Sequence, residues 1–135
     1  MPTREMIDAE RSRVVSVMVV GEGTDTLDDI LRHSNWDIRS VPDVEHAMEF
    51  LPRSSPCIVI APYAKTGPAG WQELLRDIEH SKRQARMIVT DPTVDDSIWA
   101  EALNLGAYDV LAQPFEPIEV YRVVSGAWIS ILNER

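Results

Sequence analysis

The segment CIVIAPYAKTGPAG, from Cys57 to Gly70, carries the strongest structural signal in this chain. Its first five residues form a short run without a charged side chain, which is typical of a strand buried on both faces of a parallel sheet. Pro62 closes the run, and the glycines and prolines between Lys65 and Gly70 indicate a loop. The segment therefore predicts a central strand with a loop at its carboxyl end.

Strand-like and helix-like segments alternate on both sides of this strand. The other strands are expected at residues 14–20, 36–41, 86–90 and 108–112, and helices at about residues 24–33, 43–51, 71–80, 93–105 and 118–132. Pro52 to Pro56 are expected to stop the second helix. Five such units predict an α/β fold with one doubly wound parallel sheet, in the flavodoxin-like strand order 2-1-3-4-5. We expect one domain over residues 14–135, preceded by a polar extension at residues 1–13.

Composition restricts the function classes. The 135 residues are 44% apolar and 26% charged, as in ordinary soluble domains, and the net charge is −9. An acidic surface repels nucleic acid and anionic lipid, so we expect neither partner. The single cysteine, Cys57, excludes an internal disulfide and favours a reducing compartment. No apolar run approaches the ~18 residues that span a membrane, and we expect a cytoplasmic location.

Several positions, taken in order, resemble the receiver domains of response regulators. Val17 to Val20 lead into the place of that family's acidic pair, and Val89-Thr90 match the end of its fourth strand. Further matches run from Ala102 to Ala107 and continue at Asp109, Leu111, Pro114 and Phe115. The resemblance covers residues 14 to about 130 and implies the receiver (βα)₅ sandwich and a place in signal transduction.

The positions that should carry receiver chemistry are mostly altered. The resemblance implies an aspartate nucleophile, two further acids for magnesium, a lysine and a hydroxyl. These positions are occupied here by Pro62, Gly21-Glu22, Gln113 and Thr90. Proline has no carboxylate, and one acid makes a poor magnesium site. We therefore expect an atypical receiver, or pseudo-receiver, that is not an enzyme, binds no metal or cofactor and is not phosphorylated at the usual site.

Function is then expected in contacts with other proteins. The resemblance points to the face formed by the fourth helix, fifth strand and fifth helix, the usual dimer and output surface of receivers. The predicted interface, for a homodimer or another protein partner, comprises Trp99, Leu103, Val110, Tyr121, Val124 and Trp128. Val110 also replaces the aromatic residue that the family often carries in its fifth strand.

Two other interpretations remain open from the residues. A flavodoxin-like protein could hold the phosphate of FMN or of a nucleotide in the loop Gly21–Thr26. A receiver could also be phosphorylated at another acceptor, such as Asp91 or Glu22. The histidines show no ligand spacing and are expected as solvated helix residues.

Overall fold

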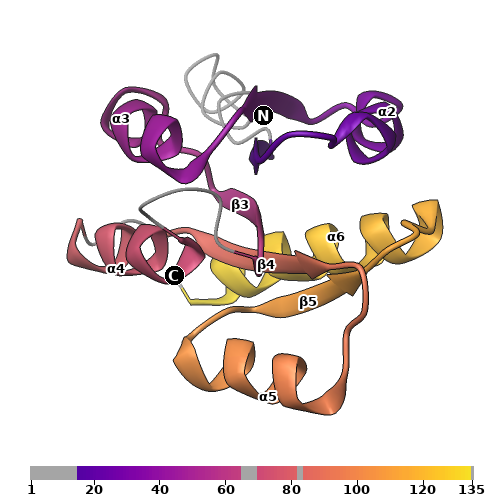
Figure 1. Cartoon of the computed structure of the whole chain (residues 1–135). Coiled ribbons are helices and arrows are strands. Elements are labelled where there is room, and N and C mark those ends of the chain that lie inside the picture. Colours follow the sequence, from indigo (N-terminus) through magenta and orange to yellow (C-terminus); the bar gives the residue numbers. More distant parts are fainter. Residues whose placement is uncertain (1–14, 65–69, 82–83, 135) are drawn as a thin grey trace.

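Five parallel strands form one sheet in the order β2-β1-β3-β4-β5 (Figure 1). The computed structural model describes residues 15–64, 70–81 and 84–134; the predicted extension and residues 65–69 of the loop lie outside these ranges. The strands are β1 Ser16–Val20, β2 Asp37–Val41, β3 Ile58–Pro62, β4 Arg86–Asp91 and β5 Asp109–Ala112. The predicted fold and strand order are confirmed.

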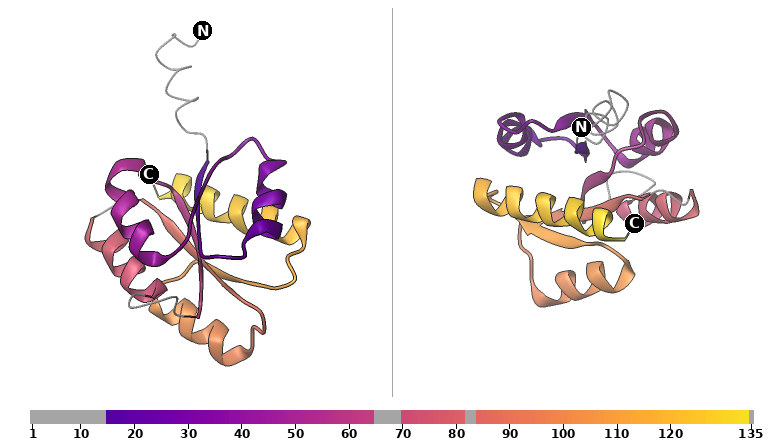
Figure 2. Two further views of the ribbon diagram at one scale, coloured as in Figure 1. Left: turned by 45° about the horizontal axis from the view of Figure 1, so that its top comes forward. Right: turned by 180° about the vertical axis from the view of Figure 1, so that it is seen from behind.

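Helices cover both faces of the sheet (Figures 1 and 2). They are α2 Asp25–Arg32, α3 Val44–Ser54, α4 Trp71–His80, α5 Asp96–Leu105 and α6 Pro117–Asn133. Side chains of α3, α4 and α5 share one core cluster, and those of α2 and α6 share the other. In the described part of the chain, none of these helices is long and apolar enough to cross a membrane.

The two cores follow from the alternation of side chains along the central strands. On β1, Met18 faces the core under α3 and α4, whereas Val17 and Val19 face the core under α2 and α6. On β3, Val59 faces the first of these cores and Ile60 faces the second. Because both faces are covered, these strands are apolar at almost every position, as the sequence pattern indicated.

The helix ends agree with the sequence except in α3. Asp43 and Asp95 cap α3 and α5, each accepting a hydrogen bond of 2.8 Å from the backbone N–H three residues later. The segment Pro52–Pro56 ends α3 as predicted, but Pro52 itself does not, because the helix continues to Ser54. A proline in the last turn removes only its own N–H bond. The helix ends instead at Ser55, which adopts a left-handed conformation with φ 43°.

Gly106 ends α5 and supplies a test of local packing. Its φ is +117°, and an added Cβ would lie 3.1 Å from Glu79 Oε1 and 3.3 Å from Leu75 Cδ2. Gly106→Ala is therefore expected to lower the free energy of unfolding by more than about 1 kcal/mol, measured by urea denaturation. Gly23→Ala is the control, because Gly23 has φ +70° with no atom within 4 Å of the added Cβ. Equal losses in the two variants would show that backbone strain alone, without the contact on α4, sets the cost.

Candidate functional site

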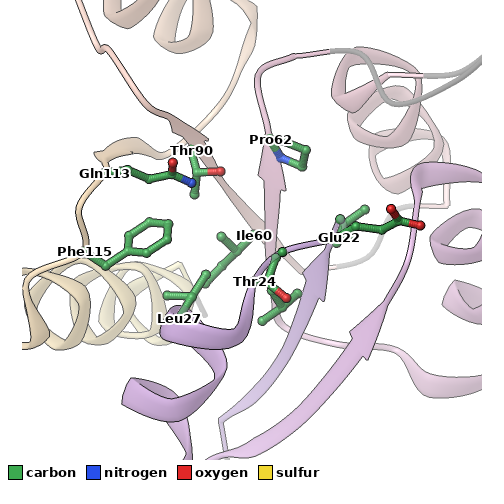
Figure 3. Close-up of a pocket in the computed structure, with 12 residues that line it drawn as sticks. Glu22, Thr24, Leu27, Ile60, Pro62, Thr90, Gln113 and Phe115 are labelled. Carbon is green, nitrogen blue, oxygen red and sulfur yellow. The ribbon is translucent and has the colours of Figure 1, made fainter.

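A cavity opens where the carboxyl ends of β1, β3, β4 and β5 meet (Figure 3). This rim is where doubly wound sheets bind their ligands. The cavity has a volume of about 100 Å³ and is lined by Val19, Val20, Gly21, Glu22, Gly23, Thr24, Leu27, Ile60, Pro62, Thr90, Gln113 and Phe115. All five positions that the receiver resemblance singled out are among these residues, so the structure brings them together.

Pro62 is the last residue of β3 and lies in register with Thr90 of β4. The strand pairing continues past it, because the Tyr63 N–H donates a 2.8 Å hydrogen bond to the Thr90 carbonyl. The proline ring lies beside the β1 loop, with its Cγ 3.6 Å from the place that a Cβ on Gly21 would occupy. An apolar ring thus stands where a receiver nucleophile would be, and it supplies no acceptor oxygen.

The loop after β1 leaves a single carboxylate near the cavity. Gly21 has φ +121°, a conformation that favours glycine, and its N–H donates to the Val41 carbonyl at 2.9 Å. Glu22 is exposed, and its carboxylate points away from Thr90 and Gln113 (Figure 3). The surviving acid of the predicted pair is therefore not directed into the cavity.

Thr90 and Gln113 form the neutral polar wall of the cavity. Thr90 is 7% exposed, and its hydroxyl has no hydrogen-bond partner among the described residues. The Gln113 side chain lies next to it in Figure 3. Gln113 precedes Pro114 through a cis peptide bond, and its backbone N–H donates to the Asp91 carbonyl at 3.2 Å. An amide at this position hydrogen-bonds but provides no positive charge for a phosphoryl group.

Asp91, a suggested alternative acceptor, is not among the residues that line this cavity. It is 8% exposed, and one carboxylate oxygen accepts the Thr93 N–H at 3.0 Å. Within residues 15–64, 70–81 and 84–134, no group of three or more histidine, cysteine, aspartate or glutamate side chains is placed to hold a metal ion.

The loop Gly21–Thr26 leads into α2, whose first turn carries Asp25 and Asp28. The Asp28 carboxylate is buried and accepts hydrogen bonds of 3.1 Å from the hydroxyls of Thr24 and Ser40. Acidic side chains thus already occupy the positive end of the helix dipole. This arrangement disfavours the phosphate of a flavin or nucleotide at the same place.

Helix α5 carries an exposed tryptophan of the predicted interface, Trp99. Ala102 is its only buried residue. Trp99 and Leu105 are 48% and 49% exposed, and Leu103 is half-buried. Trp99 and Leu103 are thus placed on the surface as the sequence predicted, and Leu105 extends that surface.

The prediction for β5 and α6 needs correction. Val110 and Val124 are 8% and 0% exposed and belong to the core, because β5 packs under α5 and Val124 faces the sheet. Tyr121 is half-buried, and its hydroxyl donates a hydrogen bond to the Ile30 carbonyl. Its ring packs edge-on against the ring of Trp36, with the two ring centroids 5.6 Å apart. Trp128 is also half-buried and packs against the same core.

A different face of α6 is exposed. Ile118, Ile129 and Leu132 are 84%, 53% and 36% exposed. At ~100° per residue, their spacing of 11 and 3 residues places them within about 60° of one another on the helix. The sequence did not separate this stripe from the buried one, because apolar residues surround more than half of α6.

Tyr63 makes a connection that the sequence did not predict. Its hydroxyl donates a hydrogen bond to the Glu101 carboxylate, which links the end of β3 to α5. That bond, with the nearby negative charge, raises the pKa of Tyr63 above its ordinary value because the carboxylate disfavours a phenolate. The two residues are 38 positions apart, and no local pattern relates them.

Comparison with solved structures identifies the fold. The receiver domain of a modulated diguanylate cyclase from Desulfovibrio desulfuricans has a TM-score of 0.78 at 19% identity, over 90% of this chain and 99% of that one. A CheY-like receiver domain protein from Methanospirillum hungatei gives 0.77 at 13% identity, over 90% and 99% of the two chains. NtrX from Brucella abortus gives 0.81 at 19% identity, over 90% of this chain but 28% of that longer one.

These similarities show that the chain has the receiver fold. No protein-family model and no curated protein matches the sequence.

Proposed function

We propose that this protein is a receiver-like signalling domain that accepts no phosphoryl group at the usual position and acts through contacts with another protein or a second copy of itself. One observation carries the proposal: Pro62 ends β3 in register with Thr90, inside the cavity where a receiver holds its nucleophile.

The chemistry of the rim supports this proposal. Phosphoryl transfer by the receiver mechanism requires an acceptor carboxylate, a magnesium site and a cation that neutralises the phosphoryl oxygens. Pro62, the outward Glu22 and the neutral Gln113 provide none of these inside the cavity. The suggested acceptor Asp91 accepts the Thr93 N–H with one carboxylate oxygen and does not line the cavity.

The exposed apolar side chains of α5 and α6 support the interaction role. Trp99 and Leu105 on α5, with Ile118 and Ile129 on α6, are each about half exposed or more. The two helices flank β5, which lies at the edge of the sheet. Tryptophan is enriched at the centres of protein interfaces, where it contributes most of the binding energy.

The loss of phosphoryl acceptance has a direct test. In a two-dimensional amide NMR titration, magnesium followed by magnesium with beryllofluoride, a mimic of the acyl phosphate, is expected to leave the amides of Glu22, Tyr63, Thr90 and Gln113 unshifted. The reason is that, among the described residues of the cavity lining, the one carboxylate belongs to Glu22 and is directed away from Thr90 and Gln113, and a single acid makes a poor magnesium site.

A matched variant and a labelling experiment complete this test. Pro62→Asp restores a carboxylate at the same backbone position. If beryllofluoride shifts the rim amides in this variant only, the absence of shifts in the natural protein is due to Pro62. Mass spectrometry after incubation with acetyl phosphate detects a phosphoryl group added to an alternative acceptor, such as Asp91 or Glu22. Saturable shifts at the rim, or an added phosphoryl group, in the natural protein would overturn the proposal.

A further inference from the structure

The rim cavity continues into a second depression. The latter is about 400 Å³ and is lined by Gly23, Thr26, Pro92, Gln113, Pro114 and Phe115. It shares Gly23, Gln113 and Phe115 with the cavity around Pro62. Together they form a hollow that reaches the size of small-molecule sites, which begin at about 300 Å³. The hollow lies past the carboxyl ends of the strands, the ligand position of this architecture.

Thr90 indicates that this hollow is built for a hydrogen-bonding guest. Its side chain lines the inner cavity at 7% exposure, and its hydroxyl has no partner in the described part of the chain. A hydroxyl that faces a cavity and makes no hydrogen bond to a neighbouring side chain is available to a molecule that enters the cavity. In Figure 3 the hydroxyl is directed toward the space between β4 and Pro62, and Gln113 lines the same cavity.

The lining also restricts the charge of the guest. Among the described residues, neither cavity has a lysine, arginine or histidine in its wall, so these walls offer an anion no counter-charge. The one acid, Glu22, points away, so a cation entering the inner cavity would lack one too. Much of the lining is instead aromatic or aliphatic, and its ring-bearing members are Pro62, Pro92, Pro114 and Phe115.

We propose that this hollow binds an uncharged, partly aromatic small molecule without forming a covalent bond to it. The hydroxyl of Thr90 and the amide of Gln113 hydrogen-bond its polar group, and Phe115 and the proline rings hold its apolar part. This site is additional to the protein-contact role proposed above, and its test does not depend on α5 or α6.

The test uses probes that differ only in charge. Benzamide and a panel of other uncharged aromatic amides and lactams are screened by amide NMR for shifts at Thr90, Gln113 and Phe115, with benzoate and benzamidine as the anionic and cationic counterparts of benzamide. We expect saturable rim shifts with uncharged members and none with the two ions. Thr90→Val, which keeps the shape but removes the hydroxyl, is expected to weaken the best binder about tenfold, the effect of one hydrogen bond.

Thermal unfolding separates a ligand role from a structural one. Without ligand, Thr90→Val is expected to leave the Tm unchanged or raise it, because the variant removes an unpaired buried hydroxyl. Thr93→Val makes the same chemical change at a residue that lines neither cavity and should leave binding unaffected. The proposal is overturned by a panel without an uncharged rim binder, by binding equally strong in Thr90→Val, or by equal binding of benzoate.

Discussion

Replacing Trp71 by alanine is expected to lower the free energy of unfolding by about 3–5 kcal/mol. Trp71 is the first residue of α4 and is 2% exposed. Its ring packs in the core under α3, α4 and α5, and lies 6.2 Å from the ring of Tyr63 at the rim. Alanine would leave a large cavity that rigid neighbouring strands cannot fill. Guanidinium unfolding followed by far-ultraviolet circular dichroism measures the loss.

Trp99→Ala is the matched control for this variant, because the same side chain is removed from a position that is 48% exposed. Its cost is expected to stay within about 0.5 kcal/mol, as for most surface substitutions. If Trp71→Ala lowers the free energy of unfolding no more than Trp99→Ala does, the packing of α4 against the sheet is contradicted.

For binding to a partner, we expect the exposed Trp99 to matter although its removal costs little stability. Trp99→Ala combined with Leu103→Ala should weaken association by about 2 kcal/mol or more, roughly 30-fold, because a buried aromatic anchor dominates most interfaces. Analytical ultracentrifugation measures self-association. Affinity capture with the natural protein and the double variant as paired baits measures the retention of a protein partner.

The specificity of this effect is checked at the other end of the same helix layer, where α3 contacts β1 and β2 whereas α5 contacts β5. Glu49→Ala changes an exposed residue of α3 and should leave both measurements unchanged. If the Trp99 and Leu103 double variant alters neither the sedimenting mass nor the captured proteins, α5 is not the contact surface and the interaction proposal fails for this face.

Most of the fold could be predicted from short-range patterns. Apolar runs without charge identified the central strands, since both faces of a parallel sheet are covered by helices. Once the strand order was inferred, the rim followed, because the carboxyl ends of parallel strands meet at one edge of the sheet. That is why Gly21, Pro62, Thr90 and Gln113, far apart in the sequence, were correctly expected to lie together.

The surface of α6 and the contacts of Tyr63 could not be predicted in this way. The apolar residues of α6 cover more than half its circumference, so periodicity alone could not decide that Val124 faces the core and Ile129 faces solvent. The bond between Tyr63 and Glu101 depends on where α5 lies relative to the end of β3. Such a contact is set by tertiary packing, which neither residue type nor local spacing specifies.

The two edges of the sheet determine how copies of this protein can meet. Edge strands are templates for fibril-like growth unless they are short or charged. The outer strand β2 exposes Asp37, Arg39 and Ser40, and β5 is only 4 residues long. Neither edge favours the addition of a foreign strand. Crowded solutions of this protein should therefore form discrete, reversible assemblies through helix surfaces rather than amyloid, even though several large apolar side chains face the solvent.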